Sequence, residues 1–432
     1  MQVRPTPTRR DFLGGSAAAG AALLLGSGAR AQDAAASERS LRLGVIGVGN
    51  RGRSNLDGVA HEGIAALCDV DGRFLAQAAK RFPEAKTYTD FRRMLAAEEL
   101  DAVVVSTPDH THAVATLDAL ERGLHVYCEK PLTHSVAEAR RVREAARRAG
   151  VATQMGTQIH AGENYRRVVE LVRAGAVGAV KEVYVFCGKG WWAPALPEGG
   201  GGEVPPHLDY ELWTGPAHLL PYHEGYHPAN WRRYWNYGGG TLADMACHYM
   251  DLPFWALSLE APVDVEAEGP AVHADGTPEW LHARWTFPAR GDAPPVVLHW
   301  YDGGRRPEIL AEHGIDWGSG VLFVGERGML LADYSHRRLM PEADFREFEP
   351  PAPSIAPSIG HYKEWLAACR APAGERATTC SFEYGGALTE TVLLGAAAFR
   401  AGAKLTWDAG AMRAAGADVQ ALLDRPYREG WS

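Results

Sequence analysis

The 432-residue sequence contains no CxxC pair and no cluster of cysteines with histidines, although it has six cysteines. This absence argues against the common zinc sites and against a dithiol redox pair, so no metal site is predicted. The sequence also lacks any long run of lysine or arginine, which argues against nucleic acid as a partner. No internal repeat is evident. The content of 46% hydrophobic and 22% charged residues is that of an ordinary globular protein, and the chain is long enough for two domains.

The first 31 residues have the pattern of a twin-arginine export signal. Arg9 and Arg10 come just before Phe12, an apolar run extends to about residue 25, and Ala29 and Ala31 provide small residues for cleavage. The run is too short and too rich in glycine to make a good membrane span. We therefore predict a signal peptide over residues 1–31 and an exported, periplasmic protein without a stable membrane anchor.

Export by this pathway follows folding, which has two consequences. The chain folds in the reducing cytoplasm and cannot depend on disulfides, so most of the six cysteines are expected to be buried thiols. A cofactor would be acquired before export and would travel inside the protein, because no free NAD pool is known outside the cytoplasmic membrane. The cofactor is therefore expected to be tightly bound.

Residues 41–71 predict a dinucleotide-binding unit. An apolar strand over 41–46 is followed by Gly47, Gly49 and Gly52 at GxGxxG spacing, and a helix is expected from about Asn50. The glycines allow a tight turn, a close approach to a pyrophosphate and close packing of helix on strand. Asp69, at the end of the next strand, can bind the two ribose hydroxyls of adenosine. Its carboxylate would repel a 2′-phosphate, so NAD is favoured over NADP, although Arg73 nearby could weaken this preference.

Strands and helices go on alternating up to residue 156. Extended segments are expected at 86–88, 102–105, 125–128 and 151–155, with helices up to residue 82, after Asp90, from about 113 to 122, and up to residue 149. Ser135 and Glu138 form a capping box for the last of these helices. Residues 40–156 are therefore predicted to be a Rossmann domain with a doubly wound parallel sheet.

From residue 157 to residue 432 the pattern changes to that of a second domain. A helix is expected at 164–174 and a strand at 181–186, followed by a long irregular stretch that includes a mobile loop at Gly199–Gly202. Alternating segments at 281–287, 296–301 and 321–324 predict a mostly antiparallel sheet, and residues 361–400 are expected to be helical.

The segment 231–257 contains the strongest candidate for catalysis. After three glycines, a helix is expected from about Thr241, and on it Asp244 and His248 are four residues apart on one face, with Asp251 one turn further on. An imidazole can take the proton of an alcohol while a hydride leaves the same carbon, and a carboxylate can orient the imidazole. Taken alone, such a pair is more often an ordinary surface pair.

Aromatic residues are dense between residues 191 and 255. They are Trp191, Trp192, Tyr210, Trp213, Tyr226, Trp231, Trp235 and Tyr237, interleaved with His207, His227, Asn230, Arg232 and Arg233. As a set, rings with polar neighbours suit the apolar faces and hydroxyl rims of sugars. For any single ring, packing in the core is the better interpretation. The residues expected to contact substrate are Gln158, His160, Tyr226, Trp231 and Arg232, and Asn164 could reach the same cleft.

Three motifs in order, AVVVSTPDHTH at 102–112, EKP at 129–131 and the glycine-preceded helix with Asp244 and His248, resemble the Gfo/Idh/MocA family. This family includes glucose-fructose oxidoreductase and inositol dehydrogenase. The resemblance covers nearly the whole mature chain. It implies a Rossmann domain followed by an α+β domain with a large, open-faced, mostly antiparallel sheet, through which relatives commonly associate, so a homo-oligomer is expected. It also implies that Lys130, Asp244 and His248 are catalytic and that His110 and His112 line the nicotinamide side of the site.

Together these patterns predict an NAD-dependent oxidoreductase that acts on a hydroxyl group of a sugar or cyclic polyol. A redox-neutral glycosidase or lyase that works by transient oxidation of the sugar stays open, as does a non-catalytic sugar or nucleotide sensor. The residues expected to bind the cofactor are Gly47, Gly49, Asn50, Arg51, Gly52, Asp69, Thr107, Pro108, His110, His112, Glu129 and Lys130.

Overall fold

The computed structural model describes residues 40–197 and 201–431. The predicted signal peptide and Gly199 and Gly200 of the predicted mobile loop therefore lie outside the described residues. Two β-sheets account for all the strands of the described part of the chain. None of the helices in this part is long and apolar enough to cross a membrane.

The first sheet is the predicted Rossmann sheet. Its six strands are all parallel and lie in the order β3-β2-β1-β4-β5-β6, which is the arrangement of a doubly wound nucleotide-binding fold. The strands are β1 (Arg42–Ile46), β2 (Gly63–Cys68), β3 (Lys86–Tyr88), β4 (Ala102–Val105), β5 (His125–Glu129) and β6 (Thr153–Gly156). Because β1 and β4 are central and buried, their sequences are continuous apolar runs rather than alternating ones.

The second sheet has nine strands in the order β13-β12-β11-β7-β10-β9-β8-β14-β15. They are β7 (Val180–Phe186), β8 (Asp264–Glu268), β9 (His282–Phe287), β10 (Val296–Tyr301), β11 (Gly320–Gly325), β12 (Gly328–Ala332), β13 (Arg337–Met340), β14 (Leu405–Asp408) and β15 (Arg413–Ala415). Only the pair of β7 and β10 is parallel among the strand pairs of residues 40–197 and 201–431 that belong to this sheet. The prediction of a mostly antiparallel second sheet is confirmed.

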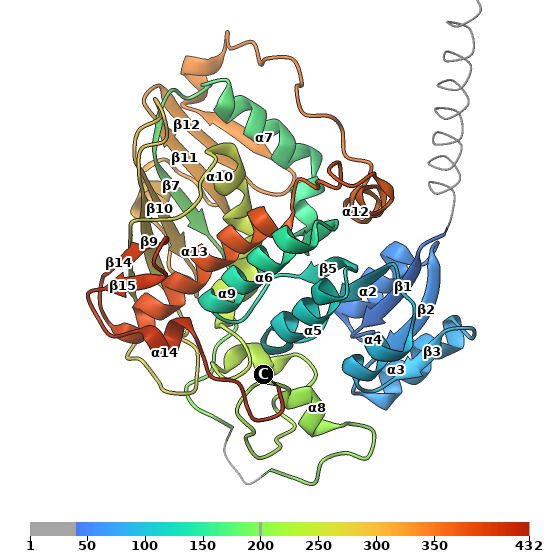
Figure 1. Ribbon diagram of the computed structural model, residues 1–432. Coiled ribbons are helices and arrows are strands. Elements are labelled where there is room, and N and C mark those ends of the chain that lie inside the picture. The colour runs from blue at the N-terminus through green and yellow to red at the C-terminus, as the bar shows by residue number, and fades with distance from the viewer. Residues whose placement is uncertain (1–39, 198–200, 432) are drawn as a thin grey trace, which may run out of the picture.

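Helices cover both faces of the first sheet and mainly one face of the second, since on its other face only the short helix with Leu310 packs, against Phe186 and Leu322, among the helices that the structure describes. They are α2 (Arg51–Val59), α3 (Gly72–Arg81), α4 (Phe91–Ala97), α5 (Asp109–Glu121), α6 (Val136–Ala149), α7 (Glu163–Arg173), α8 (Tyr210–Thr214), α9 (Gly240–Tyr249), α10 (Asp251–Ala256), α11 (Glu308–Glu312), α12 (His361–Arg370), α13 (Phe382–Ala401) and α14 (Gln420–Leu423), with 3-10 turns η1 (Gln158–Ala161), η2 (Asn230–Arg233) and η3 (Glu342–Phe345). In Figure 1, α5, α6, α9 and α13 lie between the two sheets.

Two helices differ from the sequence-based expectation. α5 begins at Asp109 rather than near Ala113, because Pro108 has the extended backbone of an N-cap residue and Asp109 can occupy the first turn. The predicted helical region 361–400 is two helices, α12 and α13, separated by residues 371–381. The predicted capping box of α6 is confirmed, since the Ser135 hydroxyl accepts from the Glu138 amide and the Glu138 carboxylate accepts from the Ser135 amide.

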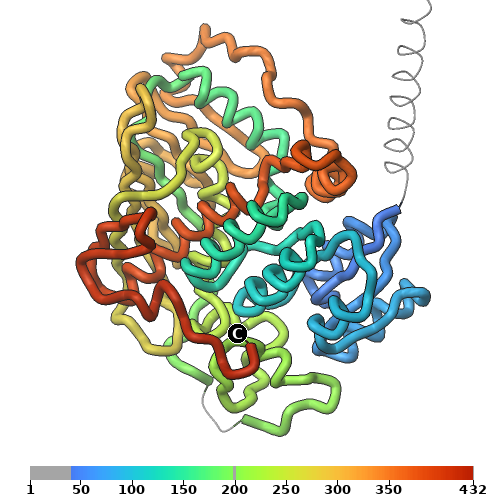
Figure 2. Tube along the Cα trace, viewed as in Figure 1, coloured from blue at the N-terminus to red at the C-terminus, as the bar shows by residue number. Residues whose placement is uncertain are grey.

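One segment of the C-terminal half returns to the first sheet. Trp365, Leu366 and Cys369 of α12 are buried in the same core as Leu43 and Val45 of β1. Figure 1 shows α12 beside β5 and α2, apart from the second sheet. The tail after α14 crosses the molecule in another direction and runs beside residues 210–217 (Figure 2), where the Arg428 amide donates to Pro216 O at 3.0 Å. The division of the chain at residues 156 and 157 therefore describes the sheets but not all of the packing.

Candidate active site

A cavity of about 640 Å³ lies at the carboxyl ends of the first sheet's strands and extends to α9 of the second half. Ligands of doubly wound sheets bind at this edge. The predicted residues that line the cavity are Gly47, Gly49, Asn50, Arg51, Asp69, Thr107, Pro108, His112, Glu129, Lys130, Gln158, Trp231, Arg232, Asp244 and His248. The structure thus brings together residues that are up to two hundred positions apart in the chain.

The glycine turn between β1 and α2 packs closely against its neighbours because its side chains are missing. A Cβ atom added to Gly47 would lie 2.6 Å from Ser106 O, and one added to Gly52 would lie 2.1 Å from Gly47 O. Gly47 also has a φ of +83°, which disfavours other residues. Gly52 does not line the cavity but permits α2 to pack against the turn, as predicted. The residues present fit a dinucleotide, since amides at the start of α2 can receive a pyrophosphate.

Asp69 lies at the carboxyl end of β2 and lines the cavity. Its carboxylate accepts the amide protons of Val48 at 2.8 Å and of Asp71 at 2.9 Å, so it also holds the glycine turn in place. Burial raises the pKa of this carboxyl to about 6. Arg73, which could have paired with a 2′-phosphate, instead donates to Asp71 through two nitrogens, at 3.1 and 2.8 Å.

Lys130, Asp244 and Arg232 form a hydrogen-bonded group that lines the cavity. Lys130 Nζ donates to Asp244 Oδ1 at 2.8 Å and to Asp244 O at 2.7 Å. Arg232 Nε donates to the same Oδ1 at 3.1 Å, and Trp191 Nε1 donates to Oδ2 at 2.8 Å. Burial alone would raise the pKa of the Asp244 carboxyl, but Lys130 and Arg232 together hold it well below its usual range. Asp244 therefore stays ionised and fixes two cations at the cavity.

His248 follows Asp244 by one helical turn and lines the cavity. Burial lowers the pKa of its imidazole well below the usual range, and the charge of Lys130 adds to this effect. The imidazole is therefore neutral and can accept a proton. Its Nδ1 atom is buried and makes no hydrogen bond with any residue that the structure describes.

Glu129 links α2 to η1 at the cavity. Its Oε1 atom accepts from Arg51 Nε at 3.2 Å, from Asn55 Nδ2 at 3.0 Å and from Gln158 Nε2 at 2.8 Å. Gln158 also donates to the Tyr127 hydroxyl at 2.7 Å. Gln158 thus lines the cavity but is held by protein groups.

The two predicted histidines of α5 have different positions. His112 lines the cavity, although its ring nitrogens lie 2.7 Å from Pro131 O and 2.8 Å from Thr107 O. His110 is fully buried, with its nitrogens 2.9 Å from Trp213 O and 3.2 Å from Tyr237 O, and it does not line the cavity. This corrects the expectation for His110. Because α5 starts at Asp109, residues two apart on it point in different directions.

Three of the residues expected to reach substrate belong to other parts of the fold. Tyr226 is buried within the aromatic cluster around Trp213 and Tyr237, so for this ring core packing is the correct interpretation. Asn164 donates to Asp333 O and His336 O, each at 2.9 Å. His160 is buried away from the cavity.

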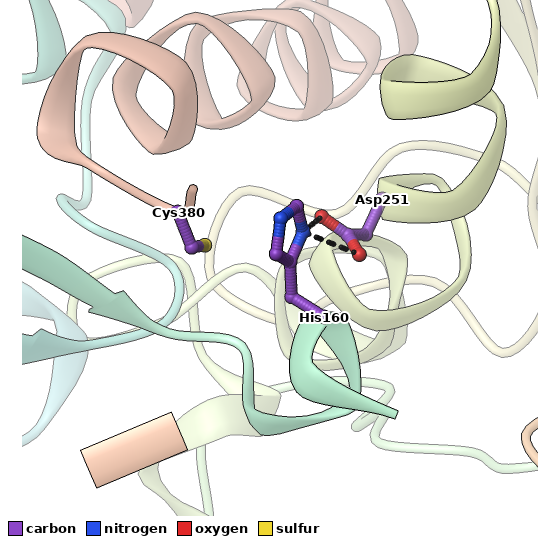
Figure 3. A group of neighbouring side chains, drawn as sticks. All are labelled: His160, Asp251 and Cys380. Atoms are coloured by element: carbon purple, nitrogen blue, oxygen red, sulfur yellow. Dashed lines mark hydrogen bonds and ion pairs between the residues drawn. The ribbon is translucent and has the colours of Figure 1, made fainter. Parts of the chain in front are cut away.

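His160 belongs to a separate buried group with Asp251 and Cys380 (Figure 3). Its Nδ1 atom lies 2.9 and 3.1 Å from the two carboxylate oxygens of Asp251, which also accepts from the Tyr384 hydroxyl at 2.8 Å. The ligand-type atoms of the three residues lie within 4.8 Å of one another. The prediction that the protein has no metal site stays a prediction. All six cysteines are free and buried in the described part of the chain, as expected.

Sequence reasoning missed Asp109, whose carboxyl is buried in the cavity wall. Burial raises the pKa of this group to about 7, against the opposing effect of Arg232. Its position directly after Pro108, in the short turn that follows the central strand β4, could have indicated it. Other lining residues that were not predicted as site residues include Phe74, Lys189, Leu212, Trp213, His227 and Tyr334. They come from distant parts of the chain, and only the aromatic density pointed to some of them.

Comparison with known proteins agrees with this geometry. Residues 41–157 match the model of an oxidoreductase family with an NAD-binding Rossmann fold, residues 168–301 match its C-terminal alpha/beta domain, and residues 6–26 match a twin-arginine signal sequence. Inositol 2-dehydrogenase of Corynebacterium glutamicum is 32% identical over 147 residues, 32% of this chain and 43% of that protein. Alpha-N-acetylgalactosaminidase of Shewanella oneidensis is 31% identical over 150 residues, 32% of this chain and 33% of that protein. The chain therefore matches less than half the length of these relatives.

A solved structure resembles the chain over a longer range. The WlbA dehydrogenase from Bordetella pertussis, in complex with NADH and UDP-GlcNAcA, has a TM-score of 0.59 at 20% identity and covers 86% of this chain and 99% of its own. At this identity the likeness supports the fold alone. With the glycine turn, the parallel sheet and both domain matches in agreement, the chain belongs to the Gfo/Idh/MocA family of oxidoreductases.

Proposed function

We propose that the protein transfers a hydride between a hydroxyl-bearing carbon of a sugar or cyclic polyol and a tightly held NAD. The observation that carries this proposal is the meeting of Lys130, Asp244 and neutral His248 in the cavity that begins at the glycine turn. Arg232 and Trp231 offer a cation and an aromatic ring on the substrate side, with the guanidinium 4.2 Å from the ring centroid.

Each of these residues has a distinct task in alcohol oxidation. A bound NAD would supply the acceptor for the hydride that leaves the carbon. His248 takes the hydroxyl proton, since a neutral imidazole is a base at neutral pH. Lys130 stabilises the negative charge that develops on the oxygen, and Asp244 fixes the ammonium in place through two acceptor atoms 2.7 and 2.8 Å away. Gln158, Glu129 and Arg51 hold the wall between cofactor and substrate.

The sequence similarity to an alpha-N-acetylgalactosaminidase favours a second candidate, a redox-neutral glycosidase or lyase. Oxidation of a ring hydroxyl acidifies the neighbouring C–H bond. His248 or Asp109 could then take that proton while the glycosidic oxygen leaves and is protonated, which forms a C=C bond in the sugar. In a glycosidase water would add to this bond, whereas in a lyase it would remain, and in both cases the hydride would return to the ketone. Asp109 suits this role because a carboxyl whose pKa is about 7 can both give and take a proton at neutral pH.

The experiment starts from protein exported by its own signal and purified without added nucleotide. Denaturation should release NAD or NADH in near-stoichiometric amount. The loaded enzyme is then incubated with pairs of sugars and, separately, with aryl glycosides, and products are identified by mass. An oxidised sugar together with a reduced one supports hydride transfer between substrates, whereas free aglycone without an oxidised sugar supports the second candidate. Empty protein that binds NAD only weakly would contradict both.

A further inference from the structure

A segment of the second half of the chain covers the end of the active-site cavity at which the adenosine of NAD is expected. Asp69 and Val70, at the carboxyl end of β2, line the cavity there, and Phe74 of α3 lines it as well. The centroid of the Phe74 ring lies 6.1 Å from that of His227, which in turn lies 6.2 Å from that of Trp213 in α8. All three rings line the cavity, so they form a row that joins the first half of the chain to α8.

The residues just before α8 are bonded to the first half through their backbone. The Gly72 amide donates to His207 O at 2.7 Å, and the Asp209 amide donates to Val70 O at 3.0 Å. Between these two hydrogen bonds the segments form one antiparallel bridge. Apart from Val70, none of these residues lines the cavity. A substitution at the others can therefore affect a bound nucleotide only by moving a neighbour that does line it.

A buried charge lies between the two segments. The Asp71 carboxylate is fully buried and accepts from Arg73 at 3.1 and 2.8 Å. Its Oδ2 atom also lies 4.0 Å from His207 Nε2 and 3.8 Å from His227 Nε2. Burial alone would raise the pKa of this carboxyl, but Arg73 holds it below the ordinary value, so Asp71 stays ionised. A carboxylate in this position attracts the N–H groups of the histidines that precede and follow α8.

The other end of α8 is attached to the last residues of the chain. Arg428 Nη2 donates to Glu211 O at 2.9 Å, and Arg428 Nε donates to Gly215 O at 3.1 Å. Because α8 is attached on one side to this tail and on the other to residues 70–72, it can leave the cavity only if one attachment opens. The attachment to residues 70–72 includes two backbone hydrogen bonds, each of small net stability, so it can open without unfolding of either half.

We propose that residues 207–213 act as a clasp that keeps NAD in the protein, and that the nucleotide leaves only when the hydrogen bonds to Val70 and Gly72 break. This proposal rests on the proposed function in one respect, namely that NAD is the bound cofactor. Asp71 is then a positioning residue, which acts on the nucleotide through the clasp and not by contact. The clasp suits an exported enzyme, because a nucleotide lost outside the cytoplasm could not be replaced.

The test is the rate at which bound NAD exchanges with added, isotopically labelled NAD, measured by mass on exported protein purified with its nucleotide. Gly72→Pro removes the amide that donates to His207 O. Proline suits this position, because Gly72 is the first residue of α3 and Asp71 before it is already extended. We expect exchange at least about fivefold faster, which corresponds to the loss of one hydrogen bond. The matched control Gly72→Ala keeps the amide, and its Cβ would lie 3.5 Å from His207 O, so it should exchange at the wild-type rate.

Equal rates in wild type and Gly72→Pro would overturn the proposal, and so would a rate in Gly72→Ala as fast as that in Gly72→Pro. If Gly72→Pro does not fold, deuterium exchange of the wild type decides. Bound NAD should slow exchange of the Asp209 amide relative to protein stripped of nucleotide, because NAD stabilises the closed clasp by mass action. Equal exchange in both forms would overturn the clasp.

Neither measurement uses turnover. Protein that oxidises no sugar but holds NAD until the clasp opens would therefore refute the proposed reaction and support the clasp.

Discussion

Addition of a 2′-phosphate to the dinucleotide should weaken its binding on the order of a hundredfold at about pH 8. The proposed position of the adenosine ribose is next to Asp69, whose carboxylate is fixed by two backbone amides. The nearest cation in sequence, Arg73, is already occupied by Asp71. A doubly charged phosphate at about 5 Å from one carboxylate, with an effective dielectric constant of about 40, is repelled by about 3 kcal/mol. This energy corresponds to roughly a hundredfold difference in affinity.

The preference for NAD over NADP should also depend on pH. Burial raises the pKa of Asp69 to about 6, so the carboxyl is ionised above this pH and neutral below it. As the pH falls through 6, the repulsion of NADP weakens, and the phosphate itself loses part of its charge in the same range. About nine-tenths of the Asp69 carboxyl is neutral near pH 5, so the ratio of the two affinities should fall toward one there.

The assay is calorimetric titration with NAD and with NADP, in their oxidised forms, after bound nucleotide has been removed. Wild type is compared with Asp69→Asn at about pH 8 and pH 5. At the higher pH, the ratio of NAD affinity to NADP affinity should be smaller in Asp69→Asn than in wild type. The remaining pH dependence of this ratio in the variant should come from the phosphate alone. Equal affinity of wild type for both nucleotides at about pH 8, or an unchanged ratio in Asp69→Asn, would refute this reasoning.

Three other changes test the remaining parts of the site. His248→Ala should lower kcat by about 10²–10⁴-fold with bound NAD retained, as measured by turnover and by the nucleotide released on denaturation, and unchanged kcat would remove its role as base. Gly52→Ala places a Cβ 2.1 Å from Gly47 O, so the folded variant should lose its nucleotide, whereas Gly72→Ala, with its nearest contact at 3.5 Å, should keep it. The pKa of Asp109 is about 7, above its unfolded value, so its protonated form stabilises the native state at low pH and this stabilisation is lost as the pH rises through 7. Urea unfolding at about pH 5.5 and 7.5 should show that wild type loses about 2 kcal/mol more than Asp109→Asn, and equal losses would contradict the burial of this carboxyl.

The first sheet could be predicted from the sequence because its signals are local. The glycine spacing, the apolar runs and the capping box of Ser135 and Glu138 each depend on a few neighbouring residues, and each forms as expected. The start of α5 could not be fixed to within four residues. The start of the helix sets which histidine faces the cavity, so the sequence did not show that His110 points into the core.

Contacts between distant segments were harder to predict. The helical spacing of Asp244 and His248 placed both on one face, but spacing does not show that Arg232 and Trp191 also reach the Asp244 carboxylate. Likewise, His160 and Asp251 are 91 positions apart, and nothing in either local pattern indicates that they pair. Of the rings in the long aromatic stretch, Trp213 and Trp231 line the cavity, whereas Tyr226 and Tyr237 are packed in the core.

The position of α12 has a consequence for biosynthesis. Because Trp365 and Leu366 complete the core around β1, the nucleotide-binding half cannot close while the ribosome has made only that half. About six-sevenths of the chain must be synthesised before the core around β1 is complete. A nascent or truncated chain that lacks α12 would present an unfilled apolar surface beside β1. Transplanting the first sheet alone into another protein would omit one wall of its core.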